Sequence, residues 1–93
     1  MSANMHYIEL LGIGSNKHLE LKGSLLTALE ELGIPFSLKE VSRIEEIIQY
    51  DISAIPAILV NGSIISENEL PEKEELMLRI KQFLKEGQAD VVV

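Results

Sequence analysis

The strongest short-range structural signal in the sequence is Ala57-Ile58-Leu59-Val60-Asn61-Gly62-Ser63-Ile64-Ile65-Ser66. Its first four residues form a continuous apolar run, which predicts a buried strand. The Asn61-Gly62 pair suits a tight hairpin turn, because both residues tolerate a positive φ angle. The four residues after the turn predict a second strand, so the stretch is expected to form an antiparallel hairpin within a sheet.

The N-terminal part of the sequence predicts a strand followed by a long helix. Residues 7–11 are mostly apolar and are followed by Gly12, as is typical of a buried strand. Ser15 is a suitable N-cap, and apolar residues then recur at helical spacing, namely Leu21, Leu25, Ala28 and Leu32. Gly33 suits the left-handed position after a helix, and Pro35 prevents the helix from continuing.

The rest of the sequence predicts one more strand and two more helices. Residues 36–41 alternate in part between apolar and polar, which indicates a strand near the edge of a sheet. Ser42 and Glu45 have capping-box spacing, so we expect a short helix that ends near Tyr50. Its three isoleucines, Ile44, Ile47 and Ile48, are expected to share one face. Residues 71–86 have helical periodicity and are followed by Gly87, which predicts the last helix.

These elements follow the order β-α-β-α-β-β-α. The first β-α-β unit makes its strands parallel, whereas the hairpin is antiparallel, so we expect an α/β fold with a four-stranded mixed sheet and three helices. We place the domain at residues 7–87, between a flexible N-terminus at residues 1–6 and a C-terminal tail at residues 88–93. The tail ends in Val91-Val92-Val93, which could add to a sheet edge.

The composition argues against several classes of function. Lys and Arg number 8 against 15 Asp and Glu, and the formal charge of −7 disfavours nucleic acid and anionic membranes as partners. No apolar run approaches the roughly 18 residues that span a bilayer, so a cytoplasmic location is expected. The absence of cysteine excludes disulfides and thiol nucleophiles. Only His6 and His18 remain as soft ligands, so we expect no metal and no cofactor.

Five motifs, read in order, resemble the small thioredoxin-like proteins of glutaredoxin size, also described as small redox-active disulfide proteins. The motifs are Gly12-Ile13-Gly14-Ser15-Asn16-Lys17-His18, Glu31-Leu32-Gly33-Ile34, Tyr50-Asp51-Ile52, Ile55-Pro56-Ala57 and Asn61-Gly62. The resemblance implies a thioredoxin-like fold and a cis bond between Ile55 and Pro56. It also implies a substrate groove between Pro56 and Ser15. Ser15 and His18 stand where the family has its attacking and resolving cysteines.

The chain cannot carry out thiol–disulfide exchange, because serine and histidine replace both thiols. A helix N-terminus shifts a pKa by only about one unit, so the Ser15 hydroxyl is expected to stay protonated. One hypothesis is a nucleophile–base pair of Ser15 and His18, three residues apart on one helical turn. The simpler interpretation is an N-cap serine followed by a solvent-facing histidine. The turn at Gly12-Ile13-Gly14 is interpreted as structural, although a weak anion could bind at Ser15 and Asn16.

Three functions are compatible with these residues. The one we favour is a non-catalytic module that binds a protein or peptide segment in a groove formed by Ser15, Asn16, His18, Ile55 and Pro56. The second is a transferase-like or glutathione-binding protein, in which Ser15 handles a thiol that the substrate supplies. The third is a structural subunit that forms a homodimer through a sheet edge.

Overall fold

The computed structural model describes residues 5–92, and side chains as far as residue 85. The element order is the predicted one, and the bounds are β1 His6–Leu11, α1 Asn16–Leu32, β2 Phe36–Val41, α2 Ile44–Ile47, β3 Ala57–Val60, β4 Ser63–Glu67 and α3 Lys73–Val92. The four strands form one sheet in the order β2-β1-β3-β4. β1 is parallel to β2 and antiparallel to β3, and β3 is antiparallel to β4. The predicted mixed α/β sheet is therefore confirmed.

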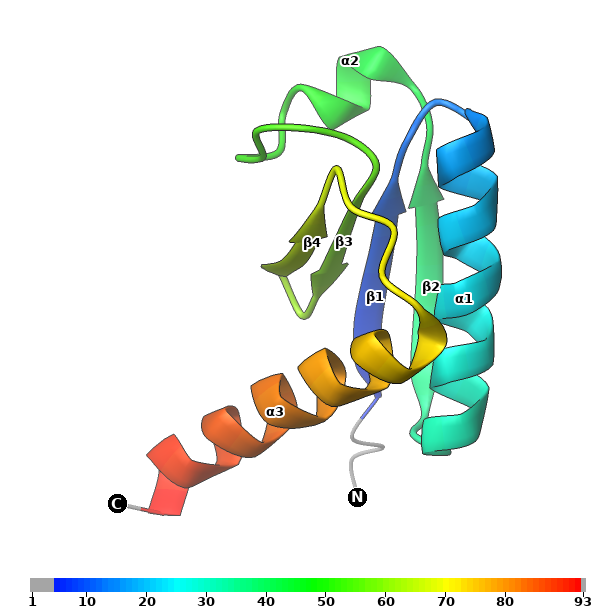
Figure 1. The fold of residues 1–93 in the computed structure, drawn as a ribbon. Helices are drawn as coiled ribbons and strands as arrows, with labels where there is room; N and C mark the ends of the chain where they lie inside the picture. Colours follow the sequence, from blue (N-terminus) through cyan, green and yellow to red (C-terminus); the bar gives the residue numbers. More distant parts are fainter. Residues whose placement is uncertain (1–4, 93) are drawn as a thin grey trace.

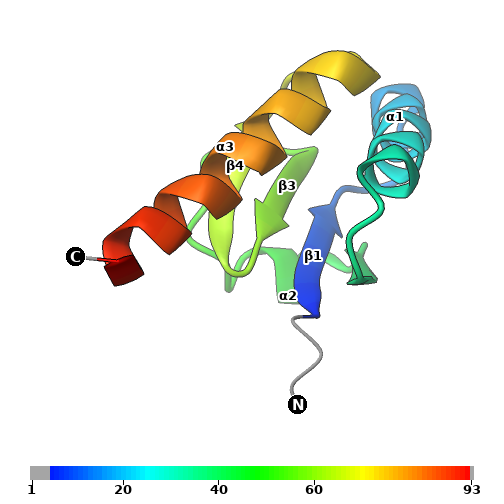
Figure 2. The same ribbon diagram turned by 90° about the horizontal axis from the view of Figure 1, so that it is seen from below.

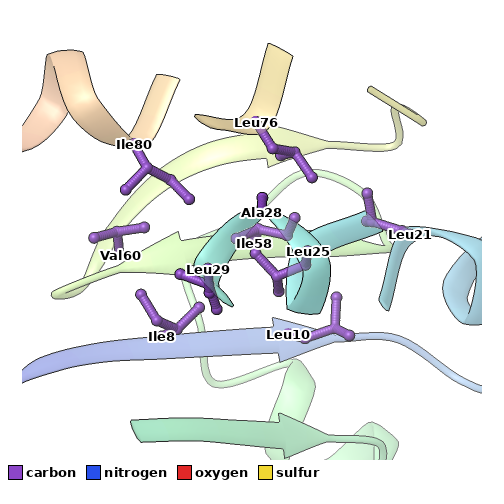
Figure 3. Close-up of a cluster of buried hydrophobic side chains, with 10 residues drawn as sticks. All are labelled: Ile8, Leu10, Leu21, Leu25, Ala28, Leu29, Ile58, Val60, Leu76 and Ile80. Carbon is purple, nitrogen blue, oxygen red and sulfur yellow. The ribbon is translucent and has the colours of Figure 1, made fainter. Parts of the chain in front are cut away.

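The helices lie on both faces of the sheet. α1 and α3 pack against one face, while the short α2 lies at the other, as the two perpendicular views show (Figures 1 and 2). Between the sheet and the two long helices lies the main core, which includes Ile8 and Leu10 of β1, Ile58 of β3, Leu25 of α1 and Leu76 of α3 (Figure 3). These side chains have no solvent-exposed surface. They fix α1 and α3 on the sheet through burial of apolar area.

A second, smaller core lies under α2. It contains Leu11, Val41, Ile47, Ala57 and Leu59. β3 contributes to both cores, because successive strand residues point to opposite faces, and all four of its residues are buried. This explains why β3 is a continuous apolar run in the sequence.

The local signals at α1 and at the hairpin are confirmed. Ser15 is the N-cap of α1, and its side chain accepts a hydrogen bond from the backbone N–H of His18. Gly33 ends the helix with a φ of 69°, in the left-handed region. Asn61 and Gly62 have φ values of 50° and 87°, as a two-residue hairpin turn requires.

The structure corrects the predicted start and face of α2. The helix begins at Ile44 with Arg43 at the N-cap position, and Ser42 does not cap it. Ile47 is buried, whereas Ile44 and Ile48 are 53% and 72% exposed. A helix of four residues turns only about once, so it directs a single isoleucine onto the sheet.

The ends of the chain also differ from the prediction. β1 begins at His6, one residue earlier than expected, and the His6 N–H donates to the Pro35 carbonyl. α3 continues through Gly87 to Val92, because an isolated glycine weakens a helix by about 1 kcal/mol without ending it. Val91 and Val92 therefore belong to a helix, not to a strand or a separate tail. Residues 1–4 of the predicted flexible N-terminus, and Val93, lie outside the described residues.

Within residues 5–92, none of the helices has the length and hydropathy needed to cross a membrane.

Candidate functional site

The first turn of α1 follows directly from the carboxyl end of β1. Gly14 has a φ of 80°, which lets the chain reverse sharply between the strand and the helix. The Ser15 hydroxyl then accepts the N–H of His18 at 3.1 Å, and the Ser15 carbonyl accepts the N–H of Leu19 at 3.0 Å. Ser15 and Asn16 are exposed, so their side chains lie at the surface of the turn.

His18 is buried, and this overturns the expectation of a solvent-facing histidine. Only 1% of the residue is exposed. Its Nδ1 accepts the backbone N–H of Gly14 at 2.9 Å, and its Nε2 lies 2.7 Å from Glu40 Oε2. Because Nδ1 acts as the acceptor, the network assigns the ring proton to Nε2, which donates to the carboxylate. Both ring nitrogens are therefore satisfied inside the protein.

Glu40, near the end of β2, joins His18 to the ammonium group of Lys22. Lys22 on α1 donates to Glu40 Oε1 at 2.9 Å, while His18 occupies Oε2. The hydrogen bond from Lys22, and after it the one from His18, lowers the pKa of Glu40 although partial burial acts in the opposite direction. The carboxylate thus ties the first turns of α1 to the sheet edge. The orienting partner lies 22 residues away in the sequence, so local inspection around His18 could not find it.

We expect this network to contribute to acid sensitivity. The folded-state pKa of Glu40 is lowered, so its contribution to stability is complete above the unfolded-state pKa and is lost as the pH falls through the folded value. Urea unfolding of Glu40→Gln between pH 7 and pH 3 should therefore show a smaller loss of stability on acidification than the wild type. Lys22→Met should act in the same direction, and Lys81→Met on α3 is the control. An unchanged pH dependence in Glu40→Gln would contradict the assignment.

The His18 ring also restricts which residue fits at position 12. A Cβ atom built at residue 12 would lie 2.5 Å from His18 Nδ1 and 2.9 Å from its Cγ. A Cβ atom does not approach a non-bonded heavy atom this closely, so only glycine fits beside the ring. Gly12 and His18 therefore form an interlocked pair beneath the turn.

The geometry excludes the nucleophile–base pair of Ser15 and His18. The ring nitrogens of His18 are engaged by Gly14 and Glu40, and the Ser15 hydroxyl contacts the backbone of His18 instead of its ring. A general base needs a free acceptor directed at the nucleophile. Among the side chains of residues 5–85, no group of three or more His, Cys, Asp or Glu residues is placed to hold a metal ion.

The loop before β3 is joined to the α1 turn by one residue that the sequence did not indicate. The Ile55–Pro56 bond is cis, and the Pro56 carbonyl accepts the N–H of Asn68 at 2.8 Å. Lys17 on α1 donates to both the carbonyl and the side-chain oxygen of Asn68, at 3.2 and 3.0 Å. Asn68 therefore places the Pro56 loop close to the first turn of α1. Asn68 has a φ of 52°, in a region where Asn is enriched. The residue type is therefore the one local sequence signal for this conformation.

A groove of about 350 Å³ continues from Ile55 toward α2. It is lined by Ile47, Ile48, Tyr50, Ile52, Ser53, Ala54 and Ile55. Among these residues, the Tyr50 hydroxyl donates to Glu9 Oε2 at 2.6 Å, and this bond to a carboxylate raises the pKa of Tyr50 to about 12. Tyr50 therefore stays a neutral donor at physiological pH, and the surface of the groove is mostly apolar.

The five predicted site residues lie in two segments. Ser15, Asn16 and His18 lie on the first turn of α1. Ile55 and Pro56 lie on the loop before β3, which Asn68 links to that turn. Ser15 and Asn16 are exposed and Ile55 is half-buried, so these three are accessible at the surface. His18 and Pro56 are buried, so their side chains are not accessible at the surface. Of the five predicted residues, Ile55 lines the groove between Ile47 and Ile55, and the other four are not part of its lining.

Comparison with known proteins agrees with the fold. The thioredoxin domain family matches residues 8–81. A thioredoxin of Methanocaldococcus jannaschii is 27% identical over 81 residues, covering 87% of this chain and 93% of that protein. A solved malarial protein superimposes with a TM-score of 0.65 at 13% identity, over 85% of this chain and 97% of the other. Glutaredoxin 1 from Francisella tularensis, at 17% identity over 86% of this chain and 98% of the other, gives a TM-score of 0.44. With most of its length matched, and with serine and histidine at the positions that resemble the two redox cysteines, the chain belongs to the thioredoxin domain family as a member without cysteine.

Proposed function

We propose that this protein is a redox-inactive thioredoxin-like module that binds an extended segment of a protein partner in the groove beside Ile55 and Pro56. The observation that carries the proposal is the apolar groove itself, whose lining ends at Ile55, the residue before the cis bond. The chain has no cysteine, so its surface has no thiol with which to react. Because no thiol is present, we propose that the groove binds a partner segment and does not react with it.

The backbone around Ile55 supports this mode of binding. Among the hydrogen bonds between described backbone groups, none uses the N–H or the carbonyl of Ile55, although Pro56 is already paired with Asn68. A backbone donor and acceptor that are not paired within the chain and lie next to a strand can pair with an added extended segment. The neighbouring apolar groove would then receive a side chain of that segment.

A titration with a neutral peptide tests the proposal. The blocked peptide Ser-Val-Leu-Val-Ser, added to isotope-labelled protein, should shift the backbone amide signals of residues 47–56 and of the first turn of α1. Ile48→Ser should weaken binding about tenfold, because it removes an exposed apolar contact worth about 1.4 kcal/mol.

Leu78→Ser is the matched control, since Leu78 is 50% exposed but lies on α3. It should leave the affinity unchanged. Shifts confined to other surfaces would contradict the proposal. Saturable shifts at Ser15 with glutathione in place of the peptide would favour the thiol-binding alternative instead.

A further inference from the structure

The rim of the groove carries an unusual distribution of charge. From Ile44 to Glu72 the sequence contains no lysine or arginine, but it contains Glu45, Glu46, Asp51, Glu67, Glu69 and Glu72. Glu46 is close enough to Tyr50 to raise the pKa of that phenol. Glu67 reaches the other end of the groove, where its Oε2 accepts the N–H of Ser53 at 2.6 Å. Carboxylates therefore flank the apolar surface at both ends.

These carboxylates are poorly neutralised within the described residues. Arg43 is the cation next to α2, and it is shared between Glu45 and Glu46 at 3.8 and 4.0 Å with most of its side chain exposed. Pairs with this geometry and exposure contribute little. Glu69 is different, because Arg79 pairs with it at 2.7 Å and offsets its charge. The formal charge of residues 44–72 is therefore negative.

Most side chains that line the same groove are apolar. Ile48 is 72% exposed and lies on the lining, and Ile44, 53% exposed, is on the same short helix. Exposed large apolar side chains gathered beside a groove mark a contact surface. A partner must therefore offer an apolar side chain together with positive charge to match both features.

We propose that the groove binds a basic segment, in which an apolar side chain is flanked by lysine or arginine; this rests on the proposed function and names its partner class. Apolar burial supplies the contact at Ile48, and the carboxylates at residues 46, 51 and 67 attract the flanking cations. An acidic or phosphorylated segment is repelled by the same rim. The formal charge of −7 strengthens the attraction at longer range.

Three blocked peptides of equal length test the charge preference: Lys-Lys-Val-Leu-Val-Lys-Lys, Ser-Ser-Val-Leu-Val-Ser-Ser and Glu-Glu-Val-Leu-Val-Glu-Glu. At low ionic strength the basic peptide should bind at least tenfold more tightly than the neutral one, and the acidic peptide should bind most weakly. The difference should shrink as salt is raised, because the Debye length falls from about 30 Å at 0.01 M to about 3 Å at 1 M. Amide shifts should locate the basic peptide at residues 47–56.

Two double charge reversals distinguish the effect of the rim carboxylates on peptide binding from the effect of the net charge. The double variant Glu46→Lys with Asp51→Lys should reduce the advantage of the basic peptide to less than threefold. The control Glu20→Lys with Glu30→Lys makes the same change of net charge at two exposed residues of α1, and it should keep most of the advantage.

Each outcome decides between the two proposals. Equal loss in both double variants would assign the preference to net charge and overturn the inference. Equal binding of basic and neutral peptides in the groove would overturn the inference while leaving the proposed function in place. No shift at residues 47–56 with any peptide would overturn both.

Discussion

His18→Ala should lower the free energy of unfolding by about 2–4 kcal/mol, the first of the two largest effects that we expect. The substitution removes a fully enclosed ring and leaves the N–H of Gly14 without its acceptor. It also deprives Glu40 of one of its two hydrogen-bond donors. Urea unfolding at pH 7 measures the change.

Leu19→Ala is the control for this experiment. Leu19 is the next residue on α1 but is 57% exposed, so its loss should change stability by no more than about 0.5 kcal/mol. If His18→Ala were as mild as Leu19→Ala, the buried position of the imidazole would be wrong.

Gly12→Ala should cost about 1–3 kcal/mol, because the new methyl group overlaps the His18 ring. All three nearest atoms to that methyl group belong to His18. The cost should therefore fall sharply when Gly12→Ala is made in the His18→Ala background, and a double-mutant cycle measures this coupling.

Gly23→Ala is the matched glycine control. No atom lies within 4 Å of a Cβ at residue 23, and the residue is inside α1. Alanine there should raise stability by about 0.5–1 kcal/mol through helix propensity. An equal cost of Gly12→Ala in both histidine backgrounds would show that backbone conformation, not the ring, requires glycine at residue 12.

The parts of the fold that could be predicted are those with local signals. Ser15 and Gly33 delimit α1 because capping depends on residues within a few positions of the helix end. Asn61-Gly62 fixes the hairpin for the same reason. The motifs around Pro56 and Ser15 led to the correct family, since they lie in the right order along the chain.

The errors arose where a distant residue or a tertiary contact decides the structure. His18 is buried because Glu40 on β2 and Gly14 before α1 supply its partners, and only the fold brings Glu40 to the ring. Capping-box spacing misplaced the start of α2, since the helix begins after Ser42 and contacts the sheet through Ile47 alone. Lys17 and Asn68 were missed because their contact spans 51 positions.

The interlock of Gly12 and His18 also constrains the order in which this sequence can change over generations. While the imidazole occupies its place, any side chain at residue 12 meets the ring and is disfavoured. Once residue 18 becomes small, residue 12 is released and can vary, and histidine can then no longer return without clashing. The effect of a substitution at either position thus depends on the residue already present at the other, so the order of the two substitutions matters.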